Sequence, residues 1–324
     1  MRTDFANLAA LVVCVALGIV FALGVLPAEP LSPVPPSSAE EVTTEVRWTT
    51  DARGVAVPLG AYRRIVSLNP VADHILLQLV EPERLVGITA HTGQEHPDAW
   101  RFGSRSQVGT SRDIEQVLNL RPDLVIASQF SQEAYMARLR EAGVAVFDLG
   151  DTRDAGTTAE NIEVLGRLLL RDAQAARLLE AYRRELDALA RAAAIRSPGP
   201  GIYLTHVGGV WFGGTRGSSY GDLLRLAGIE DLAAAGGYRD WPQFSREQIL
   251  MLAPPLVVTR PGGRDALCRD AVLSQIPACG GEGRVVEMSA GYDSDPGLGL
   301  VQAAAELQSL LQDAGSASNR SHTP

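Results

Sequence analysis

The chain has 324 residues and a formal net charge of −9 at pH 7. This negative balance argues against nucleic-acid binding, which needs a basic face to neutralise phosphates. All 29 basic residues are arginine. Because lysine is missing from this sequence, it offers no Walker A lysine, no kinase strand lysine and no Schiff-base nucleophile.

An uncharged stretch near the start predicts export. No charged residue occurs from Phe5 to Leu26, a length that could span a bilayer. We interpret residues 1–28 as a signal peptide or membrane anchor and leave its cleavage open. A Pro-rich linker follows over 29–47, and we expect residues 313–324 to form a disordered tail. The body is therefore expected to be periplasmic or extracytoplasmic, and an uncleaved N-terminal segment would hold it at the inner membrane.

Between these ends, short apolar runs alternate with helical segments. A strand is expected at 64–68 and a helix at 71–79, and the further strands are expected at 85–88, 123–127 and 144–147. This alternation predicts a mainly parallel sheet with helical crossovers. We assign residues 48–156 to an N-terminal lobe.

The alternation then stops. Residues 158–194 contain no Pro and a single Gly, Gly166, and their apolar residues recur at helical spacing. They predict one helix on the order of 50 Å long, which we interpret as a connecting backbone helix over 157–196. The strand and helix pattern resumes at 202–204 and ends with a helix at 298–311, within a C-terminal lobe over 197–312.

Two segments of the chain match each other 132 positions apart. Residues 115–126 and 247–258 both have Glu-Gln, two aliphatic residues, a Leu, a Pro two positions later and then an apolar strand. The duplication predicts an α/β fold of two pseudo-symmetric lobes with mainly parallel sheets, joined by one long backbone helix. A cleft between lobes is a favoured site for a small ligand.

Local helix chemistry is repeated as well. Asp113 and Ser245 stand two positions before the two glutamates, where an N-cap oxygen accepts an amide hydrogen. Each Glu then lies in the first turn, where the helix dipole favours an anion. Pro122 and Pro254 end the helices, because the residue before a proline resists the helical conformation.

Several segments resemble the iron-siderophore and vitamin B12 periplasmic binding proteins. They are residues 50–58, 64–68, 121–126 and especially 241–250, and the likeness covers about 48–312. The resemblance implies the substrate-binding protein of an ABC importer, not an enzyme, whose ligand is a corrinoid, a ferric siderophore or haem, with no other cofactor. It implies a monomer that delivers the ligand to a permease dimer with its ATPase subunits. It also implies that Glu115 and Glu247 dock onto permease arginines.

The loops after the carboxyl ends of the strands hold the ligand in such folds. Aromatic side chains there suit a flat or bulky ligand. The expected ligand-binding residues are Asn69, His91, Ser128, Gln129, Phe130, His206, Trp211, Phe212, Tyr238, Trp241 and Tyr292. Ser111 and Ser128 stand where the vitamin B12 member has tryptophans, which leaves the ligand open.

Cys268 and Cys279 lie close together in the sequence. In an oxidising compartment such a pair favours a disulfide that closes a short loop. Two unpaired buried thiols are the alternative. The spacing does not match a zinc motif, and we expect no metal site.

Other functions have weaker support. Residues 217–221 fit the Gly-x-Ser-x-Gly pattern of hydrolases, but the only histidine after Ser219 is His322 in the expected tail. A metal-cation-binding importer protein is an alternative, with possible ligands at His91, His96, His206 and Asp293. The same fold could also serve a membrane-tethered sensor outside transport.

Overall fold

The computed structural model describes residues 46–95, 99–103, 105–109, 114–281, 283–289 and 297–320, leaving out the side chains of 94, 95 and 313–320. They belong to one compact unit, Val46–Pro324. The predicted leader and nearly all of the predicted linker lie outside the described residues. Among the residues described, no helix is both long and apolar enough to cross a membrane.

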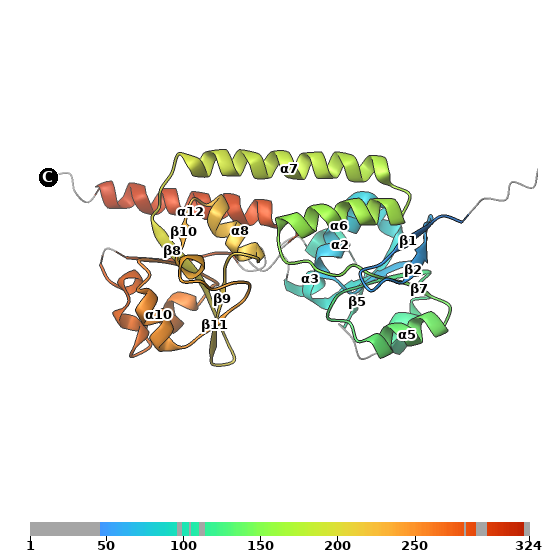
Figure 1. The fold of residues 1–324 in the computed structure, drawn as a ribbon, viewed down its shortest axis with the longest axis horizontal. Coiled ribbons are helices and arrows are strands. Elements are labelled where there is room, and N and C mark those ends of the chain that lie inside the picture. Colours follow the sequence, from blue (N-terminus) through green and yellow to red (C-terminus); the bar gives the residue numbers. More distant parts are fainter. Residues whose placement is uncertain are drawn as a thin grey trace, which may run out of the picture. The chain divides into compact units, whose positions relative to one another are not determined.

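The N-terminal lobe is built on a five-stranded parallel sheet in the order β5-β4-β3-β6-β7 (Figure 1). Its strands are β3 (Ile65–Ser67), β4 (Leu85–Thr89), β5 (Ser106–Val108), β6 (Leu124–Ala127) and β7 (Ala145–Asp148). A separate antiparallel hairpin precedes it, formed by β1 (Trp48–Thr50) and β2 (Ala56–Pro58). The helical elements of this lobe are α2 (Pro70–Leu79), η1 (Pro82–Arg84), α3 (Ala90–Glu95), η2 (Ala99–Phe102), α4 (Ile114–Asn119) and α5 (Glu133–Glu141).

The C-terminal lobe has its own sheet in the order β11-β9-β8-β12-β13, with β10 beside β8. Its strands are β8 (Pro200–Val207), β9 (Val210–Gly214), β10 (Glu230–Asp231), β11 (Gln243–Phe244), β12 (Leu256–Thr259) and β13 (Arg284–Glu287). Strands β8, β12 and β13 are parallel, whereas β9 runs antiparallel to both β8 and β11. The helical elements are α8 (Ser219–Leu226), α9 (Leu232–Ala235), α10 (Arg246–Leu252), α11 (Gly263–Cys268), η3 (Leu273–Gln275), η4 (Pro277–Cys279) and α12 (Leu300–Arg320).

The sequence repeat is a structural repeat. In each lobe a short helix, α4 or α10, leads into a fully buried inner strand, β6 or β12, with parallel neighbours on both sides. The residues before the two prolines both adopt left-handed backbone conformations, with φ of 48° at Arg121 and 43° at Ala253. This confirms the predicted class of two α/β lobes with mainly parallel sheets. The antiparallel β9 and β11 are the main departure from the symmetry.

The predicted single helix over 157–196 is two helices, α6 (Ala155–Leu168) and α7 (Asp172–Ala194), which lie against each other. The chain turns between them at Leu170, whose φ is 55°. A Cβ added at Gly166 would lie 2.2 Å from the Cβ of Ala175, so the glycine permits the close approach. The expected rod is thus shorter, and α7 alone spans the two lobes.

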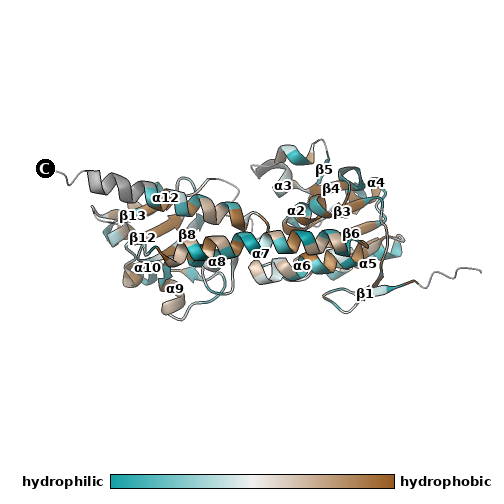
Figure 2. Cartoon of the chain, turned by 90° about the horizontal axis from the view of Figure 1, so that it is seen from above, coloured by the Kyte–Doolittle hydropathy of each residue, from teal (hydrophilic) through white to brown (hydrophobic). Residues whose placement is uncertain are grey.

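Helix α7 contacts α2 and α6 of the N-terminal lobe, and α8 and α12 of the C-terminal lobe. Its buried residues include Leu179 and Tyr182, which join the N-terminal core, while Leu186 and Leu189 pack against the C-terminal core. Figure 2 shows polar residues along its outer surface and apolar strands beneath the helices.

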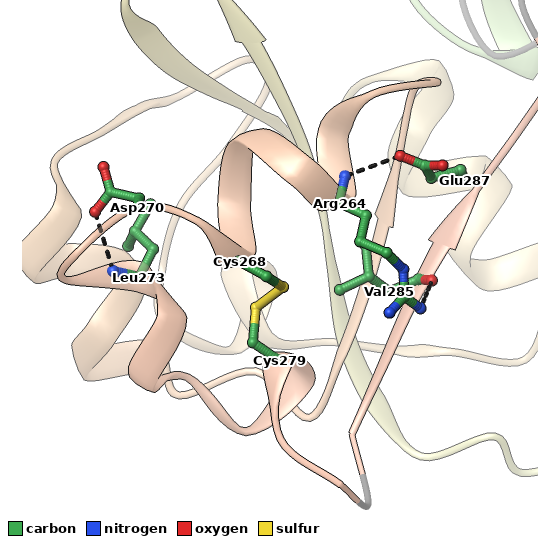
Figure 3. Close-up of a disulfide and its surroundings, with 7 residues drawn as sticks. All are labelled: Arg264, Cys268, Asp270, Leu273, Cys279, Val285 and Glu287. Atoms are coloured by element: carbon green, nitrogen blue, oxygen red, sulfur yellow. Dashed lines mark hydrogen bonds between the residues drawn. A yellow bond between two sulfur atoms is a disulfide. The ribbon is translucent and has the colours of Figure 1, made fainter.

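Two further details concern the C-terminal lobe. A disulfide joins Cys268 at the end of α11 to Cys279 in η4, with 5.5 Å between their Cα atoms (Figure 3). The expected disordered tail is instead helical as far as Arg320, as the end of α12. Residues 313–320 carry no proline, the residue that breaks a helix most strongly.

Candidate ligand-binding cleft

A cavity of about 230 Å³ lies between the two lobes at the ends of their strands. Both lobes contribute to it. Its lining residues are Pro70, Val71, Gln129, Phe130, Thr152, Ser219, Tyr220 and Trp241.

The first turns of two helices lie at this cavity, one from each lobe. Asn69 caps α2, and its Oδ1 accepts hydrogen bonds from the amides of Val71 and Ala72 at 2.9 and 3.3 Å. Ser218 caps α8 and accepts a hydrogen bond from the amide of Gly221. The amino ends of helices carry partial positive charge, so both lobes offer a weakly electropositive surface to the cleft.

Phe130 projects from a tight turn after β6. The Ser128 hydroxyl accepts a hydrogen bond from the Phe130 amide at 3.3 Å, and the Ser131 amide donates to the Ser128 carbonyl at 2.8 Å. Both serines are buried, whereas Phe130 is 79% exposed. An exposed aromatic ring on a fixed turn is suited to contact with a ligand.

Trp241 belongs to the loop before β11 and is 43% exposed. Its neighbours fix this loop to the end of β9, because the Thr215 amide donates to the Asp240 carbonyl and the Gly213 amide donates to the Pro242 carbonyl. The cleft therefore has one partly exposed aromatic ring from each lobe, Phe130 and Trp241.

Tyr220 is held in place by the strands of the C-terminal sheet. Its ring stacks on the fully buried Tyr203, with 3.9 Å between centroids and 16° between planes. A Cβ at Gly214 would lie 2.3 Å from the Tyr220 ring, so only glycine fits beneath it. The sheet thus holds the Tyr220 ring in place at the cavity.

All the lining side chains described are uncharged. Gln129, Thr152, Ser219 and Tyr220 supply amide and hydroxyl groups. Beside the cavity, Arg153 contacts Asp151 and lies 3.4 Å from Asp240, the neighbour of Trp241. The hydrogen bond that Arg153 donates to the Asp151 carboxylate, together with the negative charge of that carboxylate, raises the pKa of Arg153 above its usual value.

The structure brings together three of the predicted ligand-binding residues, Gln129, Phe130 and Trp241. Two others are used for local structure: Asn69 is 1% exposed and caps a helix, and the Ser128 hydroxyl closes the turn described above. These two are not expected to reach a ligand.

The remaining predicted residues lie elsewhere. Trp211 is 4% exposed and belongs to the core, while the exposed His206 lies beside it on β8. Tyr238 packs against Phe244 with 4.8 Å between ring centroids. Phe212 and His91 are partly buried and do not line the cavity, and Tyr292 lies outside the described residues.

The sequence interpretation missed five lining residues, which are Pro70, Val71, Thr152, Ser219 and Tyr220. A signal for two of them was present, because Ser219 and Tyr220 belong to the Gly-rich segment considered as a hydrolase motif. The segment instead starts helix α8, with Ser218 as its cap. Ser219 itself is 7% exposed.

The two glutamates predicted to dock lie on exposed surface at the starts of α4 and α10. Ser245 caps α10 and forms a reciprocal pair of hydrogen bonds with Gln248. Hydrogen bonding to Ser245 lowers the pKa of Glu247 below its usual value, which favours the charged form. The expected cap Asp113 lies outside the described residues.

The alternative metal site cannot be assembled from the described part of the chain. No group of three or more His, Cys, Asp or Glu residues placed to hold a metal ion occurs there. His96 and Asp293 lie outside it.

Comparisons with known proteins agree with this architecture. The family model described as "Periplasmic binding protein" matches residues 65–291. The cobalamin-binding protein of Halobacterium salinarum is 29% identical over 231 residues, covering 70% of this chain and 61% of that protein. The match therefore spans less than two thirds of that relative's length.

An ABC transporter substrate-binding lipoprotein of Bacillus subtilis is 26% identical over 216 residues, covering 62% of this chain and 64% of that protein. Among solved structures, the apo periplasmic haem-binding protein RhuT from Roseiflexus sp. RS-1 has a TM-score of 0.67 at 23% identity, covering 78% of this chain and 98% of that chain. The likeness to this solved structure concerns the fold alone. With a family model matched over most of its length and the two-lobed architecture in place, this chain belongs to the periplasmic binding protein family.

Proposed function

We propose that the protein is the substrate-binding component of an ABC importer and that it captures a corrinoid between its lobes. The observation that carries this proposal is a two-lobe cleft with an aromatic ring from each side and uncharged polar groups between them. The relatives named for cobalamin binding and for ABC transport support it. The protein would act in the periplasm or its equivalent, delivering the ligand to a permease and its ATPase subunits.

The chemistry of the lining favours a corrinoid over a ferric siderophore. The rim of a corrin ring carries carboxamides, which hydrogen-bond to the amide and hydroxyl groups of Gln129, Thr152 and Ser219. A ferric catecholate carries several negative charges and would need cationic partners. Arg153 is already engaged by Asp151 and Asp240.

The size of the cavity limits how a macrocycle could bind. Its volume of about 230 Å³ is below the roughly 300–1,000 Å³ of typical small-molecule pockets. A macrocycle would therefore extend outward between the lobes, with its faces against Phe130 and Trp241.

Haem is the second candidate, and Tyr220 is the observation that favours it. A phenolate is a known axial ligand of haem iron, and Tyr220 lines the cavity. A Tyr220→Phe variant would lose haem binding if its oxygen coordinates iron, but would retain a corrinoid.

The proposal is tested by isothermal titration of the purified protein with cyanocobalamin and, separately, with hemin. Cyanocobalamin is expected to bind, and Trp241→Ala is expected to weaken its affinity about tenfold through loss of one aromatic contact. Trp48→Ala is the control, because Trp48 is 59% exposed on β1 and does not line the cleft. Binding of hemin without binding of cyanocobalamin would refute the corrinoid assignment.

A further inference from the structure

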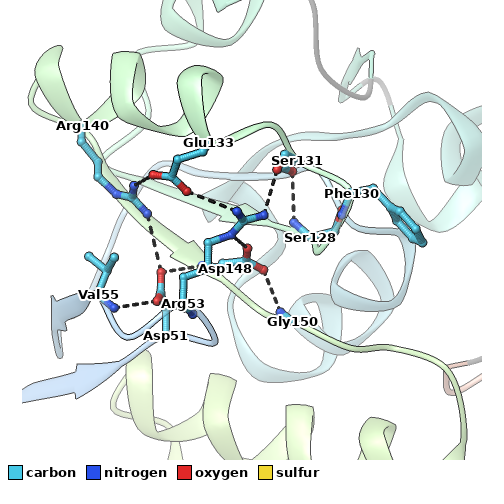
Figure 4. Close-up of polar contacts among 10 residues, drawn as sticks. All are labelled: Asp51, Arg53, Val55, Ser128, Phe130, Ser131, Glu133, Arg140, Asp148 and Gly150. Carbon is cyan, nitrogen blue, oxygen red and sulfur yellow. Dashed lines mark hydrogen bonds and ion pairs between the residues drawn. The ribbon is translucent and has the colours of Figure 1, made fainter.

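A cluster of charged residues lies behind the cleft in the N-terminal lobe (Figure 4). We call it the hairpin cluster. It joins the turn of the β1–β2 hairpin to β7 and α5, and its members are Asp51, Arg53, Glu133, Arg140 and Asp148. The Asp51 and Asp148 side chains are almost completely buried, and such carboxylates are stable only when paired and hydrogen-bonded.

Arg53 is the member that makes contacts in three directions. Its Nε donates to the Asp148 carboxylate, its Nη1 lies 3.2 Å from Glu133, and its Nη2 donates to the Ser131 carbonyl at 2.9 Å. The Arg53 side chain is 33% exposed. One side chain from the hairpin thus holds the end of β7, the start of α5 and the turn before α5.

The turn that Arg53 holds is the one that presents Phe130. Besides the bonds described above, the Ser128 amide donates to the Ser131 hydroxyl at 3.2 Å. Figure 4 shows the Phe130 ring extending from this turn away from the hairpin cluster. The Arg53 bond to the Ser131 carbonyl therefore fixes the base from which Phe130 and Gln129 reach the cleft.

A second cleft segment is attached to the same carboxylate. Asp148 accepts a hydrogen bond from the Gly150 amide at 2.8 Å through its other oxygen, and the chain then continues to Thr152 in the cavity lining. The amide of Ala52, next to Arg53, donates to the Asp148 carbonyl at 3.0 Å. Both N-terminal loops of the cleft are thus connected to the hairpin.

We propose that Arg53 is a positioning residue for the ligand: through the Ser131 carbonyl and Asp148 it holds the Gln129–Phe130 turn in its binding position. The hairpin that carries Arg53 precedes the residues matched by the family model, which begin at 65, although segment 50–58 itself resembles the family. The expected effect of Arg53 on ligand affinity rests on the proposed function. The expected effect of Arg53 on the Gln129–Phe130 turn does not depend on that function.

The first experiment compares amide hydrogen exchange in the unliganded wild-type protein and Arg53→Lys. Lysine keeps the charge beside Asp148, but a single ammonium lacks the planar fork that reaches three partners. Faster exchange is expected at Ser128, Phe130 and Ser131, with no change in the C-terminal lobe. Unchanged exchange at these three amides would overturn the proposal.

The second experiment is a double-mutant cycle on cyanocobalamin affinity. Arg53→Lys is expected to weaken binding about fivefold, the effect of one lost hydrogen bond. In a Phe130→Ala background the same change should have almost no further effect, because Arg53 acts through the turn. An equal loss in both backgrounds would show that Arg53 acts by another route and would overturn the proposal.

Arg171→Lys is the matched control. Arg171 lies between α6 and α7, is 25% exposed and pairs with Glu81 of the N-terminal lobe at 3.1 Å, away from the cleft. It should change neither readout. If the wild-type protein fails to bind cyanocobalamin, the corrinoid assignment fails, and the exchange comparison still decides whether Arg53 holds the turn.

Discussion

Asp73 is a fully buried carboxyl group close to the cleft, two residues after Val71 in α2. Its Oδ2 accepts hydrogen bonds from the amide and the hydroxyl of Thr89, at 3.1 and 2.7 Å. Burial raises its pKa from 3.8 to about 7, although these hydrogen bonds oppose the shift. The side chain connects α2 to the end of β4.

This group should make stability depend on pH in an unusual direction. Because its folded-state pKa lies above the unfolded value, the folded chain holds the proton more tightly. Its contribution to stability is therefore full below the unfolded pKa and is lost as the pH rises towards about 7. The difference is on the order of 4 kcal/mol.

An Asp73→Asn variant, which cannot ionise, isolates the effect. The free energy of unfolding of the variant minus that of wild type, both measured in urea, should be larger at about pH 8 than at about pH 5. The variant therefore becomes more stable relative to wild type as the pH rises. Asp265→Asn is the control, since that side chain is 64% exposed and paired with Arg269. A difference between Asp73→Asn and wild type that does not change with pH would contradict the prediction.

At the scale of single residues, the sequence indicated which residue types could line the cleft, but it did not fix which way each side chain faces. The loop aromatics Phe130 and Trp241 were expected in the cleft and were correctly placed there, because both line the cavity. Trp211 was not, because alternation along β9 decides which side of the sheet it occupies, and that depends on its pairing with Phe244 on β11. Asn69 stands after a strand, but the same position caps the next helix.

At the scale of elements, the α6–α7 turn is where sequence reasoning failed. Leu169, Leu170 and Arg171 have ordinary helix propensities, so nothing local marks a stop. The turn is formed by tertiary packing, in which Gly166 allows α7 to approach at Ala175. Four strands of the N-terminal sheet, β3, β4, β6 and β7, were by contrast placed within a residue or so of their observed bounds, because buried parallel strands are near-continuous apolar runs. The edge strand β5 was not predicted, since only Val108 of its three residues is buried.

The Gly166–Ala175 contact can be tested by exchanging the two residues. Gly166→Ala should destabilise the fold by about 1–3 kcal/mol through overpacking, offset in part by the better helix propensity of alanine. Adding Ala175→Gly removes the opposing methyl group and should recover part of the loss, as measured by urea unfolding. Greater stability of the single variant than of wild type would contradict the close contact.

The disulfide closes a loop between positions separated by 11 residues. A loop of this length is expected to contribute about 3 kcal/mol, chiefly by restricting the unfolded chain. Replacing both Cys268 and Cys279 with Ser should lower the thermal midpoint and remove its sensitivity to reductant. Ligand affinity should be unchanged, because neither residue lines the cleft.

At the scale of the whole molecule, duplication is what the sequence predicted best. The repeat placed equivalent helices and strands in two lobes without any knowledge of their packing, because it depends on local patterns that survive in both copies. The cleft followed from the duplication, but its lining did not. Ser219 and Tyr220 meet Gln129 and Phe130 through tertiary packing, which includes α7 against both lobes and the Arg153–Asp240 contact between them.

The same duplication places Glu115 and Glu247 at equivalent exposed positions, one on each lobe. A two-subunit permease would meet one carboxylate per subunit, and exposed charges of this kind act mainly on partner recognition. Reversing both, Glu115→Arg and Glu247→Arg, should therefore abolish ligand uptake by cells that depend on this protein. Affinity of the purified variant for the ligand should remain that of wild type, because neither glutamate lines the cleft.

The control reverses an equal number of exposed charges elsewhere. Glu83 lies in η1 and Glu230 in β10, so a Glu83→Arg, Glu230→Arg variant has the same net charge as the test variant and one change in each lobe. It should transport normally. Equal losses of uptake in both variants would trace the defect to net charge alone, whereas normal uptake in the Glu115 and Glu247 variant would show that the permease recognises another part of the surface.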